Sequence, residues 1–172
     1  MPTLRERRVQ NEATYLRTLA DLNPGRLHLE GRFVDGGAVV FQLRLVTPAR
    51  SVDGEITSEH RLRLVFPEYF PAVPIEAFLE TPVRHPNVHP ESGFICLWSR
   101  HSAGDTVVEA LLQLQRVISG ELWNRDADHL MQPEAADPVP LPFDPLRVPE
   151  SYHLERSRAH LPEGRVRRRL SS

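Results

Sequence analysis

Lysine is absent from this chain of 172 residues, whose 21 basic residues are all arginine. The chain has one cysteine, Cys96, which excludes an internal disulfide framework and a zinc site built on several thiolates. No stretch approaches the length of apolar sequence that a membrane-spanning helix needs, and the first ten residues are charged rather than apolar. We therefore expect a cytoplasmic protein without a membrane segment, in which any sulfur chemistry depends on Cys96.

Two explanations fit the missing lysine. A GC-rich genome favours arginine codons, which would change the composition without any functional reason. Lysine also carries an amine that attacks activated acyl groups, whereas arginine stays protonated and does not. A protein that handles an acyl thioester would benefit from the absence of lysine, and both explanations stay open.

The rest of the composition is that of one globular domain. Hydrophobic residues make up 40% of the chain and charged residues 26%, with a net charge of −2. We expect neither a nucleic-acid partner nor a membrane partner.

Capping boxes and apolar spacing predict two helices. Thr3 and Glu6 form the first capping box, and apolar residues at helical spacing then extend the helix to about residue 22. Thr106 and Glu109 form the second capping box, ahead of an apolar stripe that ends at Gly120.

Between these helices the apolar period is two, which predicts strands. A hairpin is expected with its turn at residues 35–37, followed by strands at 61–66 and 75–80. The predicted fold class is therefore α+β, with an N-terminal helix, a four-stranded antiparallel meander and a central helix.

Proline marks two irregular regions. Six prolines lie within residues 67–90, where they exclude a regular helix. Six more lie within residues 133–149 and predict extended chain, with a short helix near 150–160 and a basic tail at 165–169. We divide the chain into a core at 1–136 and a proline-rich extension at 137–172, packed on the core or trailing it.

Three short motifs follow one another within the first of these irregular regions and just after it. They are FPEYFPAVP at 66–74, HPNV at 85–88 and GFICL at 93–97. In this order, and flanked by the expected helices and meander, they resemble the ubiquitin-conjugating enzymes over about residues 4–136. The family has a proline-rich loop, a His-Pro-Asn motif, and then an active-site cysteine followed by leucine, before a central helix.

The resemblance implies a thioester carrier. Cys96 would accept the carboxy terminus of a ubiquitin-like protein from an activating enzyme and pass it to an amine of a target protein. A thiolate suits both steps, because it is a good nucleophile and a good leaving group. No cofactor and no metal are implied, since the activating enzyme consumes the ATP and this chain lacks a glycine-rich phosphate loop.

The His-Pro-Asn motif and the proline-rich loop supply further candidate residues. The side-chain amide of Asn87 can donate to the oxyanion that forms when an amine attacks the thioester, or it can support the loop; both roles stay open. His85 and Pro86 are given structural roles, with the imidazole tying the loop down. Tyr69 belongs to the motif of the proline-rich loop.

Charged residues complete the candidate set. The family often places an acid beyond the central helix, near the incoming amine, and Asp126 and Asp128 are the candidates, although they could equally belong to a solvated surface. Arg5, Arg7 and Arg8 of the first helix are candidates for binding the activating enzyme; an exposed polar face is the other interpretation.

The chain also departs from the family pattern. Between Asn87 and Cys96 there is one residue more than is usual, which predicts a reshaped active-site rim. Pro71 stands where ligase-binding members carry phenylalanine, so Phe70 takes over that contact or no ligase is used. These departures, with the arginine-only composition, suggest a divergent bacterial branch tied to antiphage defence.

Three other functions compete with this interpretation. A metal site would use four residues within 17 positions, although their spacing is not a zinc signature: His85, His89, Cys96 and His101. A cysteine hydrolase would need an imidazole within hydrogen-bond reach of Cys96. A catalytically inactive relative would act as a binding module.

Overall fold

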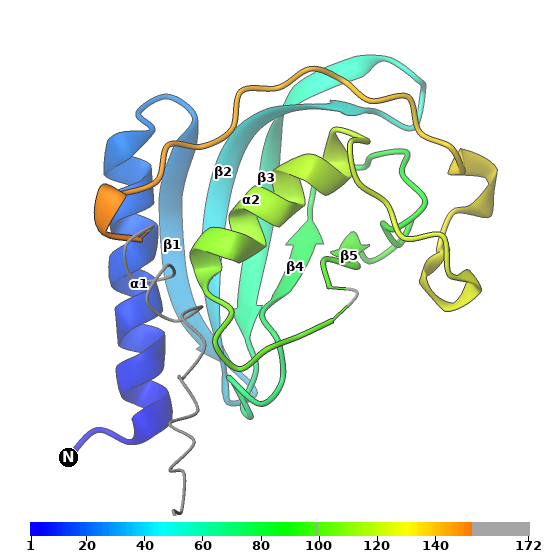
Figure 1. Ribbon diagram of the computed structural model, residues 1–172. Helices are drawn as coiled ribbons and strands as arrows, with labels where there is room; N and C mark the ends of the chain where they lie inside the picture. The colour runs from blue at the N-terminus through cyan, green and yellow to red at the C-terminus, as the bar shows by residue number, and fades with distance from the viewer. Residues whose placement is uncertain (99, 153–172) are drawn as a thin grey trace, which may run out of the picture.

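The protein, seen here as a computed structural model, is described over residues 1–98 and 100–152. A curved antiparallel sheet is covered on its inner face by one helix and flanked by another (Figure 1). The elements in chain order are α1 (Leu4–Leu22), β1 (Leu27–Asp35), β2 (Ala38–Arg50), β3 (Ile56–Phe66), β4 (Glu76–Leu79), β5 (Phe94–Ile95), α2 (Val107–Ile118), η1 (Ala127–His129) and η2 (Pro133–Ala135).

Both helices begin where the capping boxes predicted. At α1, the Thr3 hydroxyl accepts a hydrogen bond from Glu6 N at 3.1 Å, and the Glu6 carboxylate accepts one from Thr3 N at 2.6 Å. At α2, the Glu109 carboxylate accepts hydrogen bonds from both the backbone N–H and the hydroxyl of Thr106. The sequence-based bounds of α1 are thereby confirmed.

The predicted meander is present and gains a fifth strand. The order is β1-β2-β3-β4-β5 with all neighbours antiparallel, and β5 pairs with β4 through only two residue pairs. β3 also begins at Ile56 rather than at Arg61, because its first residues pair with the far end of the long strand β2. The prediction missed this start because the apolar alternation there is weak.

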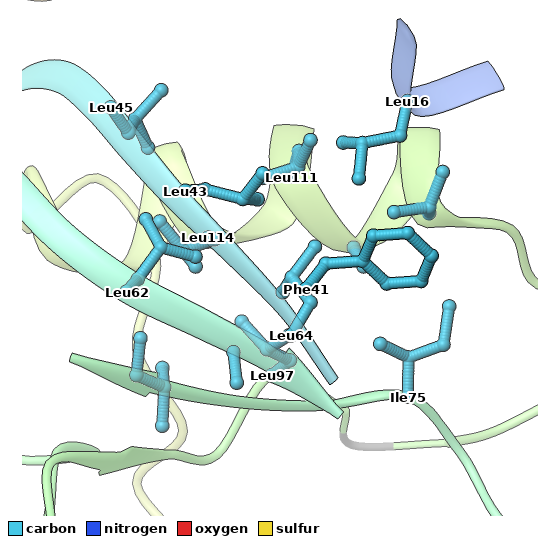
Figure 2. Close-up of a cluster of buried hydrophobic side chains, with 14 of the residues drawn as sticks. Leu16, Phe41, Leu43, Leu45, Leu62, Leu64, Ile75, Leu97, Leu111 and Leu114 are labelled. Atoms are coloured by element: carbon cyan, nitrogen blue, oxygen red, sulfur yellow. The ribbon is translucent and has the colours of Figure 1, made fainter. Parts of the chain in front are cut away.

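The core lies between α2 and the sheet, with α1 closing one side. Figure 2 shows leucines of α2 facing the side chains of β2 and β3, with Leu16 of α1 at the edge of the cluster. The residues labelled there are all buried: Leu16, Phe41, Leu43, Leu45, Leu62, Leu64, Ile75, Leu97, Leu111 and Leu114. Leu97, directly after Cys96, therefore fixes the candidate nucleophile to the core.

A buried carboxylate joins the two helices. Glu12 of α1 is 1% exposed, and its carboxylate accepts a hydrogen bond from Val107 N at 2.7 Å, at the first turn of α2. The same carboxylate pairs with Arg8 at 2.9 Å. Burial raises the pKa of Glu12, which these two contacts only partly oppose. The contacts tie the start of α2 to α1.

The proline-rich extension crosses the molecule as extended chain. It runs from η2 past the end of α2 to the side of α1, where residues 150–152 are helical (Figure 1). The Asn23 amide pairs with the backbone of Arg147 through bonds of 2.8 and 2.9 Å, and Leu146 and Tyr152 join the core. The expected basic tail at 165–169 and the remainder of the expected helix lie outside the described residues.

Within the residues that the structure describes, no helix combines the length and apolar character needed to span a membrane.

Candidate active site

A short hairpin brings the His-Pro-Asn motif beside Cys96. Cys96 N donates to Asn87 O at 2.9 Å, His89 N donates to Phe94 O at 2.8 Å, and Val88 bridges to Ile95. The residues between Asn87 and Cys96 form this hairpin. Asn87 and Cys96 therefore remain direct backbone neighbours.

The hairpin is locked to β4 through Gly93. Gly93 has a φ of +70°, and its carbonyl accepts a hydrogen bond from Leu79 N at 2.8 Å. A Cβ at this position would lie 1.8 Å from the carbonyl oxygen of Leu79. Only glycine fits here, because both the positive φ and the close approach exclude a side chain.

The side chain of Asn87 is directed at backbone groups of the segment after α2. Its Nδ2 donates to the carbonyls of Asn124 and His129, each at 2.9 Å, and its Oδ1 accepts from Asn124 N at 2.6 Å. Both amide hydrogens are thus engaged, and the residue is 1% exposed. In this arrangement Asn87 holds the segment 124–129 against the hairpin.

Cys96 meets a histidine that the sequence analysis did not consider. The Sγ of Cys96 lies 2.8 Å from Nδ1 of His129, and both residues are half-buried. Burial raises the pKa of the Cys96 thiol, so the group is a thiol rather than a thiolate near neutral pH unless a neighbour takes its proton.

A cavity of about 220 Å³ opens beside Cys96. Its walls come from the hairpin, from α2 and from the segment that follows α2. They are formed by Asn87, Cys96, Leu97, Gln113, Val117, Leu122, Trp123, Asn124 and Arg125. The guanidinium of Arg125 stacks 4.9 Å from the Trp123 ring, so apolar, polar and cationic side chains all line the cavity.

His85 is buried and stabilises the backbone of the His-Pro-Asn motif. It is 2% exposed, and its Nδ1 accepts a hydrogen bond from Asn87 N at 3.1 Å. Burial lowers the pKa of His85 to about 4, so the imidazole is neutral at physiological pH. With Nδ1 as acceptor, the ring hydrogen is on Nε2, and that nitrogen has no hydrogen-bond partner within residues 1–98 and 100–152.

We expect His85 to make folding stability depend on acid pH. The unfolded chain takes up its proton near pH 6.5, the folded protein only near pH 4. The free energy of unfolding therefore falls as the pH drops through this window, by roughly 3 kcal/mol from this group. Urea denaturation at several pH values measures the fall.

The His85→Asn variant is the matched control, since its Oδ1 can accept from Asn87 N and does not titrate. Its free energy of unfolding should depend less on pH than that of the wild type. Equal slopes in the two proteins would contradict a neutral, buried His85.

The two candidate acids lie on the segment that carries His129. Asp126 and Asp128 are exposed, and neither carboxylate makes a hydrogen bond or ion pair to another described residue. The backbone carbonyl of Asp126 accepts a hydrogen bond from His129 N at 2.9 Å. Both carboxylates are therefore free to contact solvent or a binding partner.

The three candidate arginines of α1 do not share one environment. Arg5 donates to the carbonyls of Gly37 and Pro67, at 2.8 and 3.0 Å, and Arg8 pairs with the buried Glu12. The side chain of Arg7 is exposed and makes no hydrogen bond or ion pair to another described residue. Arg7 is thus the one with a free guanidinium.

The proline-rich loop exposes Tyr69 and buries its neighbour. Tyr69 is 69% exposed, whereas Phe70 is 2% exposed and packs edge-on against Phe66 with ring centres 5.1 Å apart. The peptide bond from Phe70 to Pro71 is cis. The expectation that Phe70 would take over a ligase contact is therefore wrong, because its ring belongs to the core.

The four residues of the competing metal hypothesis have other partners. His101 Nε2 lies 2.9 Å from the carbonyl oxygen of Pro71, and His89 Nδ1 accepts hydrogen bonds from two backbone N–H groups of its own turn. Over the described ranges 1–98 and 100–152, no group of three or more His, Cys, Asp or Glu side chains is placed to hold a metal ion.

Sequence reasoning missed His129 although it selected the correct segment. The acids within residues 122–128 indicate this segment, and the imidazole of His129 lies one position beyond it. Its place in the loop that the family resemblance sets near the cysteine was the available signal. The contact with Cys96 itself depends on how this loop is tied to Asn87.

Comparison with solved structures supports the architecture, whereas two comparisons by sequence find no match. Protein-family models give no match to the sequence, and a search of curated proteins gives none either. Among solved structures, a Trypanosoma cruzi protein described as a ubiquitin-conjugating enzyme matches with a TM-score of 0.54 at 21% identity, over 78% of this chain and 89% of that chain. The chain therefore has the ubiquitin-conjugating-enzyme fold that its motifs predicted.

Proposed function

We propose that the protein is a carrier of a ubiquitin-like protein, which it holds as a thioester on Cys96 and transfers to an amine of a target. The observation that carries this proposal is the place of the single cysteine, directly after β5 and on the wall of the cavity. A half-buried thiol at such a position can be reached by an extended peptide end. The ubiquitin-conjugating-enzyme fold supports the same assignment.

The reaction has two steps in this proposal. First, Cys96 Sγ attacks the thioester carbonyl on the activating enzyme, and the thiol of that enzyme leaves. Second, the target amine attacks the new thioester, and the Cys96 thiolate is the leaving group. The products are the amide on the target and the free cysteine. Neither step needs a cofactor on this chain.

Asn87 and the two acids are given roles around the second step. Asn87 would hold the segment after α2 in place, and its amide could donate to the oxyanion once one of its two carbonyl bonds opens. Asp126 and Asp128 would orient or deprotonate the incoming amine, which their exposed carboxylates permit. Arg7 would contribute to binding the activating enzyme.

The proposed setting is a bacterial cytoplasm, where the cysteine stays reduced. The arginine-only composition and the extended C-terminal segment support a branch of bacterial conjugation systems tied to antiphage defence. Phe70 is given no role in binding a ligase, because its ring is buried against Phe66.

A cysteine hydrolase is the second candidate, favoured by the contact between Cys96 and His129. Such an enzyme usually orients its imidazole through a third group. His129 Nε2 makes no hydrogen bond to any residue in the described part of the chain. We therefore favour the carrier over the hydrolase.

The test uses the chemical lability of a thioester. The wild type, purified without reductant from the organism that encodes it, is expected to carry an added mass of small-protein size that dithiothreitol removes. Cys96→Ala should carry none, because alanine cannot form the bond. An adduct that persists in Cys96→Ala would overturn the proposal, and so would a wild-type adduct that resists dithiothreitol and hydroxylamine.

A further inference from the structure

A carrier cysteine must lose its proton each time it attacks and regain it each time it leaves. Burial raises the pKa of Cys96, so near neutral pH the thiol needs a neighbour to take that proton. Nδ1 of His129 lies 2.8 Å from the sulfur and has the geometry to do so.

The position of His129 is fixed by its backbone. His129 N donates to Asp126 O, and His129 O accepts from Asn87 Nδ2, both at 2.9 Å. Two residues further on, Met131 N donates to Pro86 O at 2.8 Å. The His-Pro-Asn loop therefore holds this segment by hydrogen bonds at His129 itself and at Met131.

The anchoring continues at Gln132, whose side chain is 5% exposed. Its Nε2 donates to the carbonyls of Val83 and Val88, at 3.1 and 2.8 Å. Buried side-chain amides with both hydrogens bonded hold backbone segments in one arrangement. Asn87 and Gln132 therefore clamp the segment that presents the imidazole.

We propose that His129 is the proton acceptor and donor of Cys96, so that the nucleophile works as a cysteine–histidine pair. The role of His129 in acyl transfer rests on the proposed carrier function. The proton exchange between the two side chains does not depend on which acyl group is carried.

In the charging step, Cys96 Sγ forms a bond to the acyl carbon while its proton passes to His129 Nδ1. The bond from that carbon to the sulfur of the activating enzyme breaks, and the departing thiolate takes the proton from the imidazolium. In the transfer step, the amine forms the amide bond to the acyl carbon while the bond from that carbon to Cys96 Sγ breaks. The proton that the amine loses passes to His129 Nδ1, which gives it to the departing Cys96 thiolate. Both steps balance without any oxidant, reductant or metal.

Among the residues that the structure describes, few charged groups line the cavity or flank the pair. Arg125 lines the cavity, Asp126 and Asp128 flank His129 on its own segment, and His85 on the facing loop is neutral. α2 contributes only uncharged side chains to the cavity wall. Proton exchange with His129, 2.8 Å from the sulfur, is therefore expected to govern the reactivity of Cys96.

The test measures alkylation of the single cysteine by iodoacetamide, followed by intact mass from about pH 5 to about pH 10. The wild type is expected to show an inflection near neutral pH. In His129→Asn the amide replaces the ring edge without accepting a proton. The thiol then keeps its burial and its 3.9 Å contact with the Trp98 carbonyl oxygen. Near pH 7 this variant should react at least about tenfold more slowly, and the two rates should converge above about pH 10.

His28→Ala is the matched control, since this histidine lies on β1 away from the site and should leave the profile unchanged. Identical profiles for the wild type and His129→Asn would overturn the proposal. A loss that persists above pH 10 would also overturn it, because a structural change would then explain the effect.

The wild type alone provides a second criterion should His129→Asn fail to fold. An isolated buried thiol would show its only inflection above about pH 9, which would contradict the pair. Alkylation needs no ubiquitin-like protein. The result therefore tests His129 even where the carrier function itself fails.

Discussion

Gly93→Ala is expected to lower the free energy of unfolding by at least about 3 kcal/mol, which is roughly 10 °C in Tm for a domain of this size. The new Cβ would lie 1.8 Å from the carbonyl oxygen of Leu79, which is backbone and cannot turn aside as a side chain would. Relief of the clash requires the hairpin to leave β4. Because β5 and Cys96 follow directly, we expect alkylation of Cys96 to change as well.

Gly54→Ala separates the clash from the backbone conformation. Gly54 has a φ of +85°, and a Cβ there meets nothing within 4 Å. Its cost should be only the strain of a left-handed alanine, about 1 kcal/mol. Thermal denaturation of both variants compares the two costs. Similar losses would contradict the close approach of the hairpin to β4.

Asn87→Ala is expected to weaken both the fold and the site. Two carbonyls and one backbone N–H lose their partner, at a cost of about 3 kcal/mol in the free energy of unfolding. The segment 124–129 should loosen and His129 should move away from Cys96. We therefore expect charging and transfer to slow together.

An oxyanion role for Asn87 would add a slowing of transfer alone. The loss of one oxyanion donor typically costs about a hundredfold or more in rate. Single-turnover charging and transfer rates, measured beside urea denaturation, separate the two contributions. If Asn87→Ala changes neither the free energy of unfolding nor the rates of charging and transfer, both the structural role and the oxyanion role of Asn87 are excluded.

Local patterns predicted most of the fold. The capping box of Thr3 and Glu6, the change from helical to alternating apolar spacing and the turn at 35–37 each depend on neighbours in sequence. β5 could not be predicted in this way, because two residues carry too little periodicity. Its strand character comes from pairing with β4.

Only part of the candidate site could be predicted, because the rest depends on tertiary contacts. The motif order placed Asn87 and Cys96 together, and the structure joins them by a backbone hydrogen bond. The contact of His129 with Cys96 arises from tertiary bonds to Asn87 and Pro86, which no local pattern records. Likewise, only the packing against Phe66 shows that Phe70 is a core residue rather than a contact for a ligase.

The thioester proposed on Cys96 is best tested by the intact mass of a Cys96→Lys variant expressed in the organism that encodes the chain. Lysine at this position can capture the transferred acyl group as an amide, which survives reductant. The account predicts an added mass of small-protein size on Cys96→Lys that is absent from Cys96→Ala, with fragmentation placing the bond at residue 96. An unmodified Cys96→Lys, beside a wild type that also carries no thiol-labile adduct, would contradict it.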